Sequence, residues 1–189
     1  EAIRLGCRTM QHVFNADDNQ IPFFSSSVRP TAYLGFSAHH SESHVPGRHL
    51  NALLNAEDAV GVQIDEEAVE KHRRAALFSY SGSVALPLNR QAIGGGLLNF
   101  CPHNLREGFH ALFALVKFRN DREAREAAER SIAAIFDFWT PDDGWNVERL
   151  ESLGVCFHKC QGFLHGEARM LGPLVKYFRA TGDGEALKL

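Results

Sequence analysis

Apolar residues recur at helical spacing along much of the chain, most clearly between residues 103 and 145. Leu105, Phe109 and Leu112 follow the i, i+3, i+4 spacing of an amphipathic helix. A second run of this kind covers residues 122–139, and a link of about three residues separates the two runs. Because so short a link forces consecutive helices to lie antiparallel, we predict an αα-hairpin here.

The same spacing predicts further helices over residues 1–14, 44–56, 65–82 and 165–183. Stretches without a sustained period separate the helix pairs, at residues 15–43, 81–102 and 140–164. Links within a pair are short and links between pairs are long, so all the long links are expected on one side. That side also holds helix N-termini, which makes it the expected ligand-binding face.

The predicted helix pairs form a weak internal repeat of about 60 residues. His44, His103 and His165 stand at or near the starts of three helices, 59 and 62 residues apart. The sequence ALVKF at 114–118 corresponds to PLVKY at 173–177. Repeated helix pairs stack on one another to bury their apolar faces, so we expect an all-α fold of αα-hairpins.

Composition and charge narrow the classes of function. Hydrophobic residues make up 44% of the chain, and the formal net charge is −3 with a pI of about 6.4. These values are typical of a globular domain and provide no basic surface for nucleic acid or an anionic membrane. No apolar run approaches the ~18–20 residues of a membrane span. The chain starts without Met and stops in the first turns of a new helix, so we expect the N-terminal part of a longer protein.

The cysteines give little indication of a metal site. Cys156 and Cys160 flank His158 in the sequence CFHKC, whereas zinc sites commonly use tighter pairs such as C-x-x-C. Buried or free thiols are the favoured interpretation. The sequence therefore leads us to expect no metal and no other cofactor.

Three phrases carry a resemblance to a known group of enzymes: LVKYFRATGDGEALKL at 174–189, ALVKFRNDREAREAA at 114–128 and PDDGW at 141–145. Together with the helix pairs, they resemble the (α/α)6-toroid carbohydrate-active enzymes, or six-hairpin glycosidases. Polysaccharide lyases and sugar epimerases are relatives of these enzymes. The resemblance implies that residues 1–189 form one toroid domain with about three of six hairpins. The rest of a longer chain, or a homo-oligomer, would then supply the remaining hairpins.

The resemblance also implies a carbohydrate substrate and a glycoside hydrolase activity. Such hydrolysis needs two carboxyl groups, one acting as acid and the other as base or nucleophile. The catalytic candidates are Asp142, Asp143, Glu107 and His103. Alternatively, the two aspartates form a polar turn before Gly144, Glu107 stabilises a helix N-terminus, and His103 is a cap or a core group.

Substrate-binding candidates are the other polar residues expected on the long-loop side, namely His44, Arg48, His49, Asn104, Arg106, His110, Trp145, His165, Glu167 and Arg169. Arginines bind carboxylates through paired hydrogen bonds, so a cluster of them suits a uronic acid. Each arginine could instead tie a loop to the scaffold. Trp145 could stack on a sugar ring or anchor a loop.

Two other functions stay open at this level. A polysaccharide lyase would abstract the proton α to a carboxylate through His, Tyr or Lys, with the acid neutralised by Arg, Asn, His or a metal. A helical-repeat scaffold would bind a protein partner on its concave face and perform no chemistry. The sequence does not separate hydrolase from lyase.

Overall fold

The computed structural model describes residues 1–28, 30–159 and 167–189. Its helices are α1 (Ala2–Met10), α2 (Val45–Val60), α3 (Glu66–Ser79), α4 (Asn104–Arg119), α5 (Arg122–Phe138), α6 (Val147–Ser152), the 3-10 helix η1 (Glu167–Met170), α7 (Leu171–Thr181) and α8 (Gly184–Lys188). Its strands are β1 (Phe14–Asn15), β2 (Ile21–Pro22), β3 (Ser25–Ser27), β4 (Tyr33–Gly35), β5 (Asn89–Arg90), β6 (Leu97–Phe100), β7 (Trp139–Thr140), β8 (Gly144–Trp145) and β9 (Cys156–Phe157).

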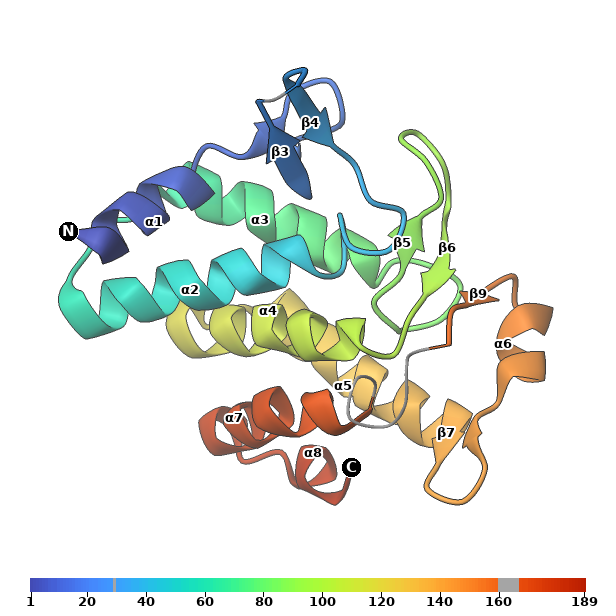
Figure 1. Ribbon diagram of the computed structural model, residues 1–189. Helices are drawn as coiled ribbons and strands as arrows, with labels where there is room; N and C mark the ends of the chain where they lie inside the picture. Colours follow the sequence, from blue (N-terminus) through green and yellow to red (C-terminus); the bar gives the residue numbers. More distant parts are fainter. Residues whose placement is uncertain (29, 160–166) are drawn as a thin grey trace.

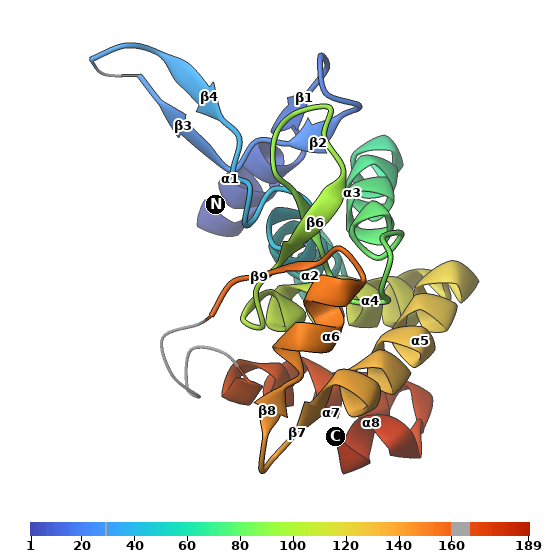
Figure 2. The same cartoon turned by 90° about the vertical axis from the view of Figure 1, so that its right-hand side faces the viewer.

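The helices pack in two layers. Helices α2, α4 and α7 lie side by side in one layer and begin at the same end of the molecule (Figure 1). Viewed along the helices, α3, α5 and α8 form the second layer behind them (Figure 2). Helix α1 packs against α2 at the edge of the first layer. The starts of α2 and α4 are therefore neighbours.

Aspartates define the starts of the second-layer helices. The side chains of Asp65, Asp121 and Asp183 each accept a hydrogen bond from a first-turn backbone N–H of α3, α5 and α8. Such a cap satisfies a donor that has no partner within the helix. Helices α2 and α7 end on Gly61 and Gly182, both at positive φ, a conformation that glycine adopts readily. The helices predicted around these positions are present.

The predicted all-α toroid is wrong. The structure is mixed α/β, with 54% helix, 12% strand and four small sheets among the described residues. The sequence predicted irregular links where these strands occur, and Phe14 lies in β1 instead of continuing the first helix. The strands are only two to four residues long, too short to produce an alternating hydrophobic pattern. Pairing satisfies their backbone hydrogen bonds, which irregular links would leave to water.

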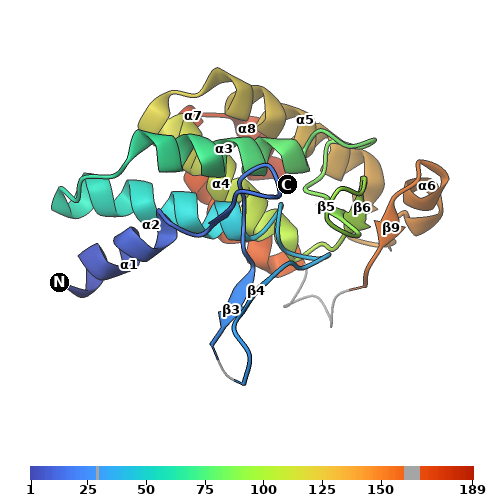
Figure 3. The same ribbon diagram turned by 90° about the horizontal axis from the view of Figure 1, so that it is seen from above.

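The most informative sheet joins two of the long links. Strand β6 pairs antiparallel with β5 and parallel with β9, which places Asn99 beside Cys156. This sheet lies at the end where α2 and α4 begin (Figure 1). The β3–β4 hairpin instead projects away from the helical layers (Figure 3). Parts of the second and third long links therefore form a structured face over the starts of α2 and α4.

The hydrophobic core lies between the two helical layers. Leu50, Phe109, Leu112 and Ile135 are fully buried there and belong to one connected cluster that also includes Tyr177 of α7. Within the part of the chain that the structure describes, no helix combines the length and apolarity needed to cross a bilayer.

Candidate metal centre

Three histidines converge at the starts of α2 and α4. His40, His44 and His103 each place one ring nitrogen within 4.8 Å of those of the other two. The Nε2 atoms of His40 and His103 are 3.1 Å apart. His44 is buried, while His40 and His103 are half-buried and accessible to a ligand. Imidazole groups gathered in this way are a common ligand set for divalent transition metals.

His40 and His44 share one side of a short helical turn that leads into α2. The backbone N–H groups of Ser41 and His44 donate to the carbonyls of Ser37 and His40, four residues earlier in each case. A spacing of four residues puts two side chains on the same face of such a turn. His103 precedes the first residue of α4, so packing of α2 against α4 brings the third ring to the other two.

Buried asparagines hold this turn in place through its backbone. Asn89 and Asn104 both donate to the carbonyl of His39, at 3.0 and 2.6 Å. Asn99 donates to the carbonyl of Ala38 at 2.8 Å. Because buried polar groups are costly to leave without partners, these bonds fix the position of the turn.

A buried ion cluster also holds the turn in place. The guanidinium of Arg90 makes two hydrogen bonds to Asp18, at 2.7 and 2.6 Å, and one to Glu42 at 2.6 Å. All three side chains are nearly inaccessible to solvent. Hydrogen bonds from Arg90 to Asp18 and Glu42 raise the pKa of Arg90 above its ordinary value, against the opposing effect of burial. Glu42 lies between His40 and His44, so this cluster anchors the turn to β5.

A glycine permits the close approach of α2 and α4. A Cβ atom placed on Gly47 would overlap the backbone carbonyl of Glu107 in α4. The first turns of the two helices are therefore in backbone contact. This contact is what allows His44 and His103, each just before its helix, to face one another.

Each of the three Nδ1 atoms has a polar partner, and the Nε2 atoms of His40 and His103 lie within hydrogen-bonding distance of each other. Asn104 uses its amide N–H to bond the carbonyl of His39, so its oxygen faces Nδ1 of His44 at 3.3 Å and accepts from it. Nδ1 of His40 lies 3.0 Å from the hydroxyl oxygen of Ser37. Nδ1 of His103 lies 2.9 Å from Sγ of Cys101. Partners of this kind orient metal-bound imidazoles and fix their tautomer.

The electrostatics favour neutral imidazoles beside an ionised carboxylate. Burial, with the charges of neighbouring groups, lowers the pKa of His40 to about 4 and that of His44 to about 3. Burial would raise the pKa of Glu107, but hydrogen bonds and charges from Arg106, His44 and Arg48 hold it below its ordinary value. The negative charge of Glu107 in turn favours positive charge at His44. Neutral imidazole is the form that binds metals.

The spacing of the His40 and His103 nitrogens is close to that of two ligands on a small tetrahedral ion. Zinc–nitrogen bonds of about 2.0–2.1 Å with tetrahedral angles place two ligand nitrogens about 3.3 Å apart. The Nε2 atoms of His40 and His103 are 3.1 Å apart. Three histidine ligands leave a fourth position, which catalytic zinc sites use for water or substrate.

Six of the residues predicted to bind or act on substrate meet in this centre. His44 and His103 are two of the three converging histidines, and Asn104 bonds His44. Glu107 is buried and accepts hydrogen bonds from Arg48, at 3.2 Å, and from Arg106. The sequence assigned these six residues to a sugar site, and the structure brings them together at the starts of α2 and α4.

The structure places the other carboxyl candidates elsewhere. Asp142 and Asp143 are exposed in the link between β7 and β8, where Asp143 bonds Thr140. This hairpin follows the C-terminal end of α5 and lies below α6 in the view of Figure 1, apart from the starts of α2 and α4. Trp145 packs edge-on against Phe100, with ring centroids 4.9 Å apart, as a loop anchor would. Among the described residues, neither aspartate contacts Glu107 or the three histidines.

The remaining predicted residues surround the centre or lie outside the described part. His49 stacks edge-on against His72 on another side of α2. His110 is half-buried in α4, and Arg169 lies in η1, which packs against α4. Glu167 begins η1. His165 lies outside the described residues, as does Cys160 of the CFHKC sequence.

His40 completes the cluster, although it was not among the residues predicted to bind or act on substrate. The available signal was the spacing of His40 and His44, since two histidines four residues apart on a helical turn can bind one metal. His158 of the CFHKC sequence bonds Asn99 at 3.1 Å and lies against His39. His158 therefore lies against the turn that presents His40 and His44, but it is not one of the three converging histidines.

Comparisons with protein-family models, with curated proteins and with solved structures find no match to this chain. Function is therefore inferred from the site itself, and the resemblance to toroid enzymes stays a prediction.

Proposed function

We propose that the chain binds one divalent transition-metal ion, of the zinc type, through Nε2 of His40, His44 and His103, and that it is a metal-dependent enzyme. The observation that carries this proposal is the convergence of three imidazoles whose Nδ1 atoms all have hydrogen-bonding partners. An arrangement that served packing alone would not require all three rings to place a nitrogen within 4.8 Å of the other two.

The chemistry proposed for this centre is hydrolysis by a metal-bound water. Zinc held by three histidines carries water as a fourth ligand and lowers its pKa to about 7, which supplies a nucleophile at neutral pH. In this proposal the bound water takes the place of the carboxylate pair expected from the sequence. Glu107 balances the charge of the centre and positions Arg48 and Arg106.

An acidic carbohydrate remains the proposed substrate class. Arg48 bonds Glu107 through Nε, and more than half of its side chain is exposed. Its guanidinium is therefore held at the surface beside Glu107, where it suits the carboxylate of a uronic acid. The N-termini of α2 and α4, which carry partial positive charge, favour an anion at the same place.

The second candidate function is β-elimination by a polysaccharide lyase. A metal and an arginine side by side would neutralise the substrate carboxylate, which is what proton abstraction at the adjacent carbon requires. The proximity of Arg48 to the histidines is the observation that favours it, since Arg48 contributes to lowering the pKa of His40 and His44.

The test measures turnover of uronate-containing oligosaccharides. The protein is first depleted of metal with a chelator and is then assayed with and without added zinc. We expect product only with metal, and we expect His44→Ala to abolish it. Release of reducing ends without ultraviolet absorbance identifies a hydrolase, and absorbance from an unsaturated product identifies a lyase. Turnover that is unchanged by chelation would contradict the metal-dependent mechanism. Metal binding without turnover would leave a binding scaffold as the function.

A further inference from the structure

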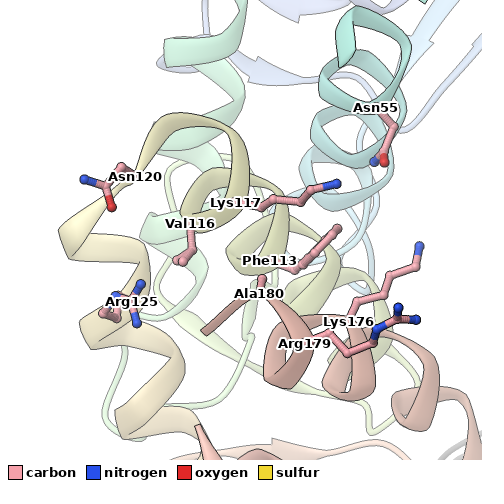
Figure 4. Close-up of a pocket in the computed structure, with 9 residues that line it drawn as sticks. All are labelled: Asn55, Phe113, Val116, Lys117, Asn120, Arg125, Lys176, Arg179 and Ala180. Carbon is pink, nitrogen blue, oxygen red and sulfur yellow. The ribbon is translucent and has the colours of Figure 1, made fainter. Parts of the chain in front are cut away.

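A second site lies at the opposite end of the helices from the metal centre. A pocket of about 590 Å³ opens between the last turns of α4 and α7, the start of α5 and Asn55 of α2 (Figure 4). Four basic residues line it, namely Lys117, Arg125, Lys176 and Arg179, and none of the described residues that line it is acidic. Helices α2 and α4 have 16 residues each, so about 24 Å separates their two ends.

The charges of this cationic pocket are poorly neutralised by neighbouring acids. Lys117 has one carboxylate partner, Asp58, at 3.9 Å, and both side chains are substantially exposed. An exposed pair at that distance contributes little. In the described part of the chain, Arg125, Lys176 and Arg179 form no ion pair with a carboxylate. The pocket therefore carries a concentrated positive potential.

Helix ends account for only part of this charge. Lys117 and Arg179 lie in the last turns of α4 and α7, where the partial negative charge of the carbonyl groups stabilises a cation. Arg125 lies in the first turn of α5, where the helix dipole disfavours a cation. Lys176 lies in the middle of α7. The helix dipole thus does not account for the positions of Arg125 and Lys176.

The cations are also gathered around one surface. The Nζ atoms of Lys117 and Lys176 lie 5.8 and 5.7 Å from the centre of the Phe113 ring. Figure 4 shows the two lysines extending on either side of this ring, with Arg179 beside Lys176. Phe113 is itself buried, so it forms a rigid floor that holds the two ammonium groups near each other.

We infer that the cationic pocket binds a small ligand bearing two or more phosphate groups. Four cations match the charge of a diphosphate, whereas a single carboxylate would leave most of them without a partner. The volume lies within the range of small-molecule sites. This site is separate from the proposed metal centre and does not depend on it.

The test is calorimetric titration of the whole chain with inorganic pyrophosphate at low salt. We expect saturable binding of one ligand per chain, with an affinity that falls as salt is added. Replacing Lys176 and Arg179 together by glutamine should weaken binding about tenfold or more, because each removes a charge-assisted hydrogen bond. Arg125→Gln alone, which leaves α7 unchanged, should also weaken it.

The control is the double variant Lys71→Gln with Arg74→Gln, which removes the same net charge from α3, outside the pocket. We expect this control to bind pyrophosphate as the wild type does. Absence of saturable binding at millimolar pyrophosphate would overturn the inference, as would equal weakening in the control. Tighter binding of orthophosphate or of digalacturonate than of pyrophosphate would show that the ligand class is wrong.

Discussion

Gly47 of α2 lies directly against the backbone carbonyl of Glu107 in α4, with no room for a side chain between them. Each of these residues is a few positions after a histidine of the metal centre, His44 in one helix and His103 in the other. The distance between the helices at this point therefore sets the distance between the two imidazoles.

Gly47→Ala should lower both stability and metal affinity. The added methyl group must push α2 away from α4, which typically costs about 1–3 kcal/mol in a packed interior. Zinc affinity should fall because His44 and His103 move apart. Chemical denaturation and zinc titration measure the two effects.

The matched control is Gly6→Ala in α1, where a new Cβ would meet no atom within 4 Å. Alanine is the better helix former, so this variant should gain roughly 0.5–1 kcal/mol and bind zinc as the wild type does. If Gly47→Ala behaved like Gly6→Ala, the close approach of α2 and α4 would not be what assembles the centre.

Asn104→Ala should weaken zinc binding about 10–100-fold, the usual effect of removing a residue that orients a metal-bound histidine. The variant frees Nδ1 of His44 and leaves the carbonyl of His39 with one donor fewer. Asn146→Ala removes a comparable hydrogen bond, at the start of α6, and serves as the control. Zinc affinity that is equal in the two variants would contradict the role given to Asn104.

Arg90→Met should destabilise the protein by about 3–5 kcal/mol, because it leaves the carboxylates of Asp18 and Glu42 buried without a counter-charge. Denaturant titration measures this change. Arg149→Met removes an arginine that pairs with Asp137 at the exposed surface, and its denaturation midpoint should stay close to that of the wild type. A small effect of Arg90→Met would show that the buried ion cluster does not anchor the turn.

Stability should fall on acidification, partly through His72. Burial, with the charge of His49, lowers the pKa of His72 to about 3, although its hydrogen bond to the Met10 carbonyl acts in the other direction. In the unfolded chain a histidine titrates near about 6.5. The unfolded state therefore binds more protons between these two values, and stability is complete above about 6.5 and lost as the pH falls toward about 3.

Replacing His72 by glutamine removes the group that takes up a proton when the protein unfolds. The slope of unfolding free energy against pH, measured with urea and a chelator present, should decrease by up to about 1.4 kcal/mol per pH unit. His49 packs against His72 from α2 and Phe14 packs against it from β1, and both stay in place in the variant. A slope equal to that of the wild type would show that His72 does not remain neutral in the folded state.

The sequence predicted the helices well because their signals are local. Asp65 and Asp121 cap helices at the positions that the sequence predicted. A cap and an apolar period each involve only neighbouring residues, so both can be recognised from the sequence. The two-residue strands were missed because their pairing is not local. Asn99 and Cys156 pair in the sheet although 57 positions separate them in the sequence, and the spacing of apolar residues does not indicate such a contact.

Part of the candidate site was also predicted from local signals. His44 and His103 were identified through their matching places before two helices, and Glu107 and Asn104 followed from the first turn of α4. His40 was not chosen because it falls in a stretch without a helical period, where its spacing from His44 carries weight only once Asn89, Asn99 and Arg90 hold that stretch as a turn. Asp142 and Asp143 attracted attention as a pair of acids, but the structure places them in an exposed hairpin.

X-ray absorption at the zinc edge of the zinc-loaded protein tests the proposed metal centre most directly. The account predicts one zinc per chain, coordinated by three imidazole nitrogens and one further light atom at about 2.0–2.1 Å. Imidazole scattering should diminish when His40 or His44 is replaced by alanine. A sulfur shell near about 2.3 Å, a shell of oxygen alone, or a spectrum unchanged by these substitutions would contradict the centre.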